Sequence, residues 1–470
     1  MIGKLAGAQH QTESTRLSAE VVICGAGIAG ISVAYHLAVV HGIRQIVVFD
    51  PLPPLSLTSD KSTECYRNWW PGPGSDMVAL MNRSIDLLEE LARESGNVFH
   101  LNRRGYLYLT ADRDRLPTFI EAAREPAQLG AGELRLHQGS PSDPQYIQGP
   151  VEGFEGAPDG ADLLLDLELI QRHFPYVNPD VIAALHVRRA GWLSAQQLGV
   201  YLMQKARQSG VQFLNGRVVS IEQQHSAVRS VRLEGNQRVY CRYFVNAAGP
   251  YAASVNKLLG VELPIYCELH QKVAFRDHLR VIPRDAPLLI WSDPQFLDWS
   301  DSERELISQE DQLAWMLAKL PAGAHARPEG GADSDILLML WEYRTLEMEP
   351  IFPLPLDEQA PEILLRGLST LAPGLKAYLQ KALRPTVDGG YYTKTRENRP
   401  LIGPLAVNGA YIIGALSGFG VMAACAAGEL LAAHLTDSPL PAYAPAFHPE
   451  RYSNPAYLEM FQNRSELGQL

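Results

Sequence analysis

The residues that most clearly predict chemistry form a glycine-rich turn near the N-terminus. Gly25, Gly27 and Gly30 stand in the run GAGIAG, between a β-rich segment, 19–24, and an apolar segment of helical character, 31–40. The first glycine permits a tight turn, the second lets the backbone approach a pyrophosphate, and the third lets a helix pack on a strand. The pattern predicts that phosphate oxygens bind the free N–H groups at the start of this helix.

A second predicted strand, 45–49, ends at Asp50, about 20 residues past the last glycine. A carboxylate at this place is typical of dinucleotide-binding units, in which it accepts hydrogen bonds from the adenosine ribose. The alternative is a chance glycine turn before a core helix. The strand, the helix and the acid together favour a dinucleotide site.

Composition limits the classes of partner. The chain has 470 residues, enough for two or three domains, and a net charge of −11, which argues against nucleic acid and anionic membrane surfaces. Its five cysteines form no CxxC pair and no metal-like spacing, so we expect reduced thiols, no metal site and a cytoplasmic protein. Residues 1–18 are polar, without the apolar core of a secretory signal, and predict a disordered tail.

The uncharged stretch 403–428 is apolar enough to suggest a membrane span. We reject that interpretation because the stretch contains Pro404, Asn408 and the run SGFG, 417–420, which predict a strand, a glycine turn and a helix.

Strands and helices alternate at both ends of the chain, and the middle is richer in strands. Helical patterns cover 76–95, 197–209, 298–320, 358–383 and 421–435. Strand patterns cover 98–110, 211–214, 218–221, 240–247, segments within 271–291, and 411–414, and 129–160 reads as a surface connection. The order predicts an α/β protein in which one nucleotide-binding domain is assembled from separated segments and a substrate domain is inserted.

Three separated motifs resemble the flavin-dependent amine and amino-acid oxidoreductases of the D-amino-acid oxidase family, to which glycine oxidase, sarcosine oxidase and dimethylglycine dehydrogenase belong. The first is the GAGIAG unit with Asp50. The second spans 191–254 and includes the run NAAGPY, 246–251, and the third spans 389–428. The resemblance covers about 19–451, nearly the whole chain.

The resemblance implies noncovalent FAD in a Rossmann-like, discontinuous FAD-binding domain, beside a β-rich α+β substrate domain. The FAD-binding domain would comprise 19–104, 190–262 and 385–451, the substrate domain 105–189 and 263–384, and the tails 1–18 and 452–470. The residues expected to contact FAD are Gly25, Gly27, Ile28, Ala29, Gly30, Asp50, Pro51, Lys61, Ser62, Thr63, Val218, Ala248, Gly249, Gly414, Gly418, Phe419, Gly420 and Val421.

Departures from the family pattern affect the substrate side. Gly390 stands where some relatives carry a cysteine bonded to flavin, hence the expectation of noncovalent FAD. Met422 and Tyr392 stand where relatives place a lysine or an arginine that holds a substrate carboxylate. Arg67 falls near a family arginine with this role, although a structural ion-pair arginine is an equal alternative. Arg67, Tyr392 and His270 are the expected catalytic residues, with His270 either a base or a structural histidine.

The resemblance implies oxidation of the C–N bond of an amino acid or N-methylated amine by hydride transfer to flavin N5, which gives an imine. Oxygen or an electron carrier would reoxidise the flavin, and a homo-oligomer or a partner subunit stays open. One alternative is a non-catalytic flavoprotein for assembly or electron transfer, with the acidic segment 298–320 as a docking element. The other is a nicotinamide-dependent dehydrogenase, which the flavin-like C-terminal motif disfavours.

Overall fold

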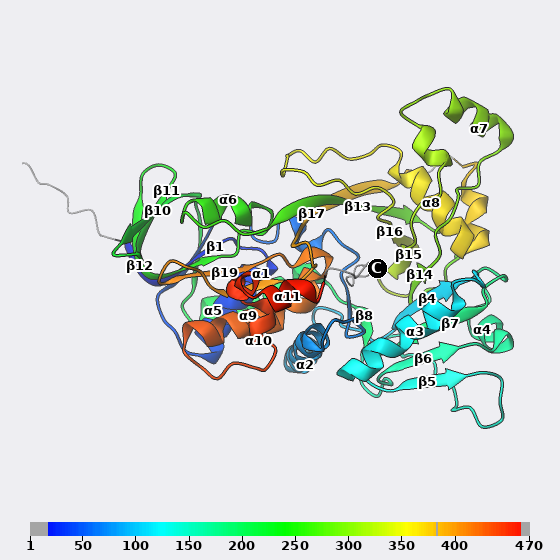
Figure 1. Ribbon diagram of the computed structural model, residues 1–470, viewed down its shortest axis with the longest axis horizontal. Helices are drawn as coiled ribbons and strands as arrows, with labels where there is room; N and C mark the ends of the chain where they lie inside the picture. The colour runs from blue at the N-terminus through cyan, green and yellow to red at the C-terminus, as the bar shows by residue number, and fades with distance from the viewer. Residues whose placement is uncertain (1–16, 382–383, 462–470) are drawn as a thin grey trace, which may run out of the picture.

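The protein is built on two large sheets that lie side by side along its long axis (Figure 1). The computed structural model describes residues 17–381 and 384–461. Most of the predicted tail 1–18 and residues 462–470 of the predicted tail 452–470 therefore lie outside the described residues.

The first sheet contains eight strands: β1 (Leu17–Cys24), β2 (Ile46–Asp50), β9 (Gln212–Asn215), β10 (Val218–Gln224), β11 (Ala227–Leu233), β12 (Arg238–Asn246), β18 (Leu401–Pro404) and β19 (Ala410–Gly414). Strands β19, β12, β1, β2 and β9 are parallel neighbours in that order. Their carboxyl ends therefore meet at one edge of the sheet, where ligands bind in open α/β folds. This arrangement confirms the Rossmann-like domain predicted from the glycine turn.

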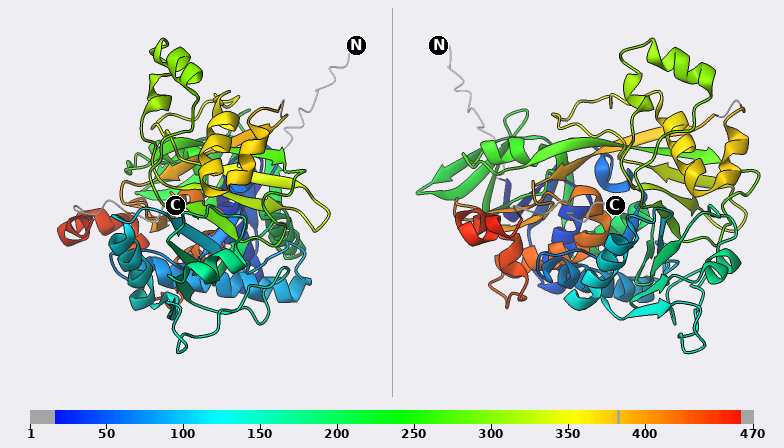
Figure 2. Two further views of the ribbon diagram at one scale, coloured as in Figure 1. Left: turned by 90° about the vertical axis from the view of Figure 1, so that its right-hand side faces the viewer. Right: turned by 45° about the vertical axis from the view of Figure 1, so that its right-hand side comes forward.

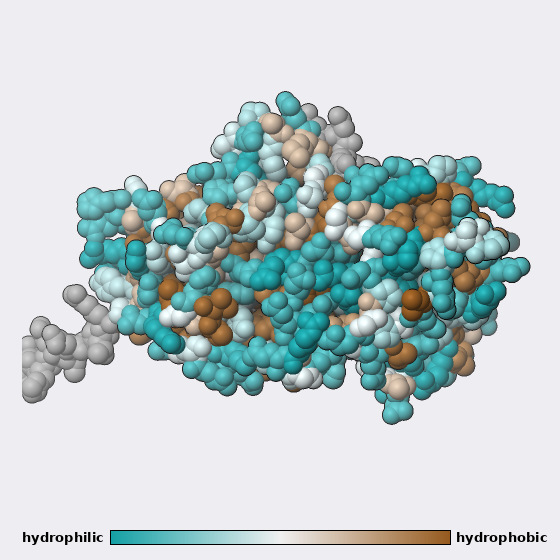
Figure 3. Space-filling model, turned by 90° about the horizontal axis from the view of Figure 1, so that it is seen from below, coloured by the Kyte–Doolittle hydropathy of each residue, from teal (hydrophilic) through white to brown (hydrophobic). Residues whose placement is uncertain are grey.

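Four helices pack with this sheet and with one another: α1 (Ile28–Tyr35), α2 (Asp76–Ser95), α5 (Ala195–Gln208) and α9 (Gly420–Leu435). The helical segment Ser417–Leu435, which contains α9, is long and apolar enough to cross a membrane by length and composition alone, but 78% of its most apolar window is buried inside the protein. Its side chains are apolar because they form core contacts with α1 and α2. The outer face seen in Figure 3 is mostly hydrophilic, with apolar residues in small scattered groups.

The second sheet contains nine strands: β4 (Tyr106–Thr110), β5 (Leu134–His137), β6 (Ala161–Leu164), β7 (Ala183–Val187), β13 (Tyr266–Arg276), β14 (Leu288–Trp291), β15 (Ala324–Glu329), β16 (Ile336–Leu340) and β17 (Thr386–Lys394). The order across it is β17-β13-β16-β15-β14-β4-β7-β6-β5. Helices α3 (Leu116–Pro126), α4 (Leu167–His173), α7 (Asp301–Ser308) and α8 (Ala360–Leu371) accompany this sheet (Figure 1). It forms the β-rich part that the sequence predicts.

Smaller elements complete the fold. Strands β3 (Cys65–Arg67) and β8 (Ala190–Trp192) form a two-stranded sheet. The remaining helices are α6 (Ala252–Lys257), α10 (Ala444–Phe447) and α11 (Pro455–Glu459). Helix α11 lies in the segment predicted as a tail, and the hydroxyls of Tyr452 and Tyr457 near it donate to Glu397.

The structure differs from the predicted segments at two places. Strand β17 lies within the predicted FAD segment 385–451 but pairs along its whole length with β13 of the second sheet. The predicted helix 298–320 is reduced to α7, which starts at a Ser300–Glu303 capping box, and a separate 3₁₀ turn, Ala314–Leu317. Asp311, a weak helix former, stands between them. The segment projects from the body in every view (Figures 1 and 2).

A close helix contact depends on Gly428 of α9. A Cβ atom there would lie 2.9 Å from the backbone carbon of Ser32 on α1 and 2.3 Å from its Oγ. We expect Gly428→Ala to lower the free energy of unfolding by about 1–3 kcal/mol, because α1 and α9 must separate. Thermal and urea unfolding of the purified protein measure this loss.

Gly331→Ala is the matched control, since a Cβ at that position meets no heavy atom within 4 Å. Equal stability of the Gly428→Ala variant and the wild type would contradict the close packing of α1 on α9.

Candidate functional site

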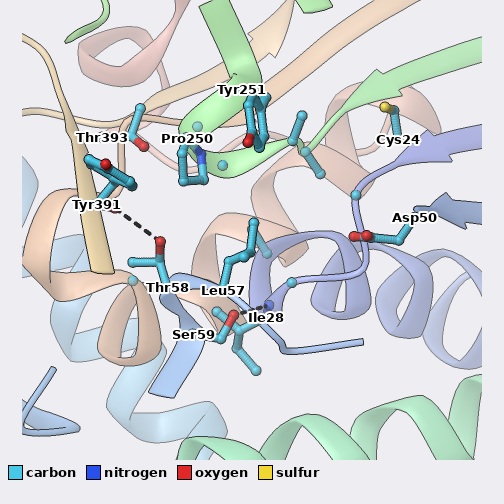
Figure 4. Close-up of a pocket in the computed structure, with 18 of the residues that line it drawn as sticks. Cys24, Ile28, Asp50, Leu57, Thr58, Ser59, Pro250, Tyr251, Tyr391 and Thr393 are labelled. Carbon is cyan, nitrogen blue, oxygen red and sulfur yellow. Dashed lines mark hydrogen bonds between the residues drawn. The ribbon is translucent and has the colours of Figure 1, made fainter. Parts of the chain in front are cut away.

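A long cavity follows the edge where the parallel strands end. Its volume is about 520 Å³. In Figure 4, Cys24 and Asp50 lie at one end and Tyr391 and Thr393 at the other. The predicted cofactor residues on its wall are Gly25, Gly27, Ile28, Ala29, Asp50, Pro51, Ser62, Val218, Ala248, Gly249, Gly414, Gly418, Gly420 and Val421. An extended cavity of this kind suits a dinucleotide better than a compact ligand.

The glycine turn has no room for side chains at two of its three glycines. Gly25 has φ +113°, and a Cβ there would lie 2.3 Å from the carbonyl oxygen of Ala247. A Cβ on Gly30 would lie 2.0 Å from the carbonyl oxygen of Gly25, so Gly30 serves helix packing and is not on the cavity wall. A Cβ on Gly27 would meet only Ser59 Oγ, at 3.3 Å, because this residue faces the cavity.

Asp50 fixes the turn from the end of β2. Its Oδ2 accepts a hydrogen bond from the Ala26 N–H at 2.8 Å, and its Oδ1 accepts one from the Leu52 N–H at 2.8 Å. A carboxylate has further lone pairs, so these bonds leave acceptor capacity for ribose hydroxyls. Beside Asp50, burial and then the Asp50 charge raise the pKa of the Cys24 thiol to about 12, which keeps it neutral.

The loop after β2 joins the two sheets across the cavity. Ser59 Oγ accepts a hydrogen bond from the Ile28 N–H at 3.0 Å, and Thr58 Oγ1 donates to the Tyr391 carbonyl at 3.0 Å (Figure 4). Ser62 lies on the cavity wall.

Two predicted cofactor residues of this loop do not line the cavity and make contacts with the second sheet. Lys61 pairs with Asp388 at 2.8 Å, and the Thr63 carbonyl accepts a hydrogen bond from Arg327 Nε at 2.6 Å. Their observed role is to hold the loop against the sheet that carries β17 and β15.

The far end of the cavity is closed by the start of α9. Gly418, Gly420 and Val421 lie on the wall, where the N–H groups and positive end of a helix stabilise negative charge. Phe419, also predicted to contact the cofactor, turns away and packs edge-on against Trp70 at 5.1 Å.

Gly390 shows why no side chain replaces the cysteine of some relatives. A Cβ on Gly390 would lie 2.8 Å from Cβ of Lys61 and 3.3 Å from Cα of Thr58. The loop after β2 therefore occupies the space that a larger side chain at this position would need.

Of the predicted catalytic residues, Tyr392 lies on the cavity wall and stacks on His270, with ring centroids 3.8 Å apart and planes 13° apart. His270 and Arg67 are not among the described residues that line the cavity. Arg67 is buried on β3, donates from Nε to the Trp69 carbonyl at 3.2 Å, and lies 4.5 Å from the Trp70 ring. The structure thus joins Tyr392 to His270 and sets Arg67 behind Trp70.

Sequence reasoning missed several wall residues. Tyr251 and Phe352 form an aromatic pair on the wall, with ring centroids 6.4 Å apart. Tyr251 ends the NAAGPY motif and could have been included on that ground. Phe352 lies in a proline-rich connection without periodicity, and no sequence signal marks it.

These features fit FAD. Two helix N-termini, those of α1 and α9, open on one cavity, and the glycine turn presents its backbone there without side chains. The α1 end suits the pyrophosphate, and the α9 end suits the ring that gains negative charge on reduction.

Comparison with known proteins also indicates an FAD-dependent protein. The family described as "DAO: FAD dependent oxidoreductase" matches residues 20–434. Mitochondrial dimethylglycine dehydrogenase of Rattus norvegicus is 26% identical over 276 residues, which are 58% of this chain and 28% of the relative. The mitochondrial pyruvate dehydrogenase phosphatase regulatory subunit of Mus musculus is 29% identical over 272 residues, 57% of this chain and 27% of the relative. The chain thus matches little more than a quarter of the length of these relatives.

A solved structure shows the same fold. The crystal structure of L-proline dehydrogenase from P. horikoshii superimposes with a TM-score of 0.71 at 20% identity, over 93% of this chain and 98% of that one.

Gly27 allows a test of the phosphate end. We expect Gly27→Ala to fold normally and to bind FAD about tenfold or more weakly, because a methyl group would stand where the pyrophosphate approaches the backbone. Titration of the apoprotein with FAD, followed by flavin fluorescence, measures the affinity, and thermal unfolding of the apoprotein checks the fold.

Gly25→Ala is the contrasting variant, since its Cβ would overlap the Ala247 carbonyl and damage the fold itself. Wild-type FAD affinity in Gly27→Ala would show that the pyrophosphate does not lie on this turn.

Proposed function

The chain belongs to the DAO family of FAD-dependent oxidoreductases, and we propose that within it the protein oxidises the C–N bond of an amino acid or N-methylated amine. FAD, when bound, would supply the two-electron oxidant for this C–N bond, and the oxidised substrate would be an imine that water hydrolyses. The observation that supports this proposal is the single cavity that joins the glycine turn after β1 to the start of α9 and to Tyr392.

The chain's own residues would bind and orient the substrate. Tyr391 and Tyr392 of β17 are at most 4% exposed, so this part of the wall would exclude water beside a bound substrate. The Arg67 guanidinium is the proposed partner of a substrate carboxylate, which its planar fork suits. Its neighbour Trp70 packs on Phe419, whose chain neighbours Gly418 and Gly420 lie on the cavity wall, so Arg67 lies one side chain behind that wall. A substrate carboxylate would therefore reach Arg67 only when the Trp70 side chain moves aside.

The names of two similar proteins support an amino-acid substrate. Dimethylglycine and L-proline, named for the rat relative and the P. horikoshii structure, are both amino acids with a substituted nitrogen. An amine of this kind with a carboxylate is therefore the first substrate class to test.

A second candidate is a flavoprotein that acts as an assembly or regulatory partner without oxidising an amine. The mouse relative named a regulatory subunit favours it. The substitution of Tyr392 and Met422 for familiar carboxylate anchors favours it as well.

Anaerobic titration of the purified protein distinguishes the two. We expect loss of the oxidised-flavin absorbance at about 450 nm with at least one amino acid or N-methylated amine, because the substrate delivers two electrons to the flavin. Readmitted air then separates an oxidase, which regains its colour quickly, from a dehydrogenase that needs a carrier. Flavin that dithionite reduces but no amine of a broad panel reduces would contradict the enzymatic proposal.

Arg67→Ala tests the carboxylate anchor. We expect KM for the amino acid to rise about tenfold or more, because a charge-assisted bidentate contact is lost, with a smaller change in kcat. Arg67→Lys, which keeps the charge and loses the fork, should fall between. Arg93→Ala, at an exposed arginine paired with Glu155, is the control. An unchanged KM in Arg67→Ala would exclude the anchor role.

A further inference from the structure

Four charged side chains form a largely buried cluster behind Tyr392. His270 Nε2 lies 3.2 Å from Glu268 Oε2, and His270 Nδ1 lies 3.2 Å from Glu342 Oε1. Lys394 Nζ lies 2.9 Å from the same oxygen of Glu268. The four residues come from β13, the segment after β16, and β17, which are brought together only by the pairing of the second sheet.

This geometry sets the charge of His270. A carboxylate oxygen only accepts hydrogen bonds, so both ring nitrogens must carry protons to make both contacts. Burial alone would lower the pKa of His270, but the charges and hydrogen bonds of Glu342 and Glu268 outweigh it and raise that pKa above 6.5. The stabilising contribution of His270 protonation is therefore complete below pH 6.5 and is lost as the pH rises through the raised pKa.

The cluster is also balanced in charge. Glu268 and Glu342 are ionised: burial would raise the pKa of Glu268, but the His270 hydrogen bond and the Lys394 charge lower it to about 2. Glu342 likewise has a pKa below its ordinary value, because the His270 charge outweighs its burial. His325 on β15 also faces the group, and burial lowers its pKa to about 4, so it is neutral. The two cations, His270 and Lys394, thus balance the two anions, Glu268 and Glu342. Such a balance is expected because a buried net charge costs free energy.

The His270 ring lies flat against Tyr392, which lines the cofactor cavity. We propose that His270 is a positioning residue: its imidazolium, held at both nitrogens by Glu268 and Glu342, fixes the Tyr392 ring on the substrate side of the cavity. With both nitrogens protonated and bonded, His270 has no lone pair for a base. Attraction between a cation and an aromatic face holds the pair in register.

Charge balance provides the test. In Glu342→Gln, Lys394 and Glu268 already neutralise each other, so His270 should lose its proton near neutral pH. Glu347→Gln is the matched control, because Glu347 lies on the same segment but is exposed and pairs with Arg396 at 2.7 Å. The measurement is ¹⁵N NMR of the FAD-loaded protein labelled at histidine, with the His270 signals identified by their loss in His270→Gln.

We expect His270 to carry protons on both nitrogens at pH 7 in the wild type and in Glu347→Gln, and to titrate at least one pH unit lower in Glu342→Gln. A neutral His270 in the wild type, or a titration that Glu342→Gln leaves unchanged, would overturn the proposal.

The link to Tyr392 rests on the proposed amine oxidation and has its own readout. In Glu342→Gln, kcat/KM for the amine should fall about tenfold per pH unit above the lowered His270 pKa and recover below it. A purely structural role would lower kcat/KM equally at every pH and would overturn the positioning role. If no amine reduces the flavin, the proposed function fails, and the NMR titration still decides the state of His270.

Discussion

The approach of Gly25 to the backbone of Ala247 is the contact on which the rest of the site depends. Strands β1 and β12 are parallel neighbours, with Cys24 opposite Asn246, so the turns that follow them leave the sheet at the same edge. The 2.3 Å that separates a hypothetical Gly25 Cβ from the Ala247 oxygen shows how closely the turns meet. The start of α1, the NAAGPY turn and the end of β19 can border one cavity only because no side chain stands between them.

The cofactor end could be read from the sequence because its determinants are local. The βαβ boundaries follow from apolar periodicity and from glycines, and helix α2 spans the predicted residues 76–95, closed by Gly96 at φ +68°. A pyrophosphate site is made of backbone N–H groups at a helix start, so the positions of the glycines specify it without knowledge of distant contacts. Asp50 belongs to the same unit, since one partner, Leu52, is two residues away in the chain and the other, Ala26, lies in the glycine turn itself.

The substrate end could not be read in the same way, because it depends on which strands pair. Lys61 and Thr63 stand in a loop that the family resemblance assigns to the cofactor, yet their partners, Asp388 and Arg327, come from the second sheet. The cluster around His270 exists only in the register that sets Glu268 opposite Tyr392. A one-residue slip of that register would turn every side chain of β17 to the other face. No periodicity within either strand specifies this register.

The two ends of the cavity are therefore subject to different physical constraints: backbone geometry at one end and charge balance at the other. Backbone groups and the Asp50 carboxylate hold the cofactor end, which depends on the close approach that its glycines allow. At the other end, charges that must balance one another lie behind Tyr392, where a change at Glu268, Glu342 or Lys394 would leave a buried charge unpaired unless a neighbour changed its protonation. The four residues are therefore constrained together, and the cluster reaches the cavity wall through the Tyr392 ring that stacks on His270.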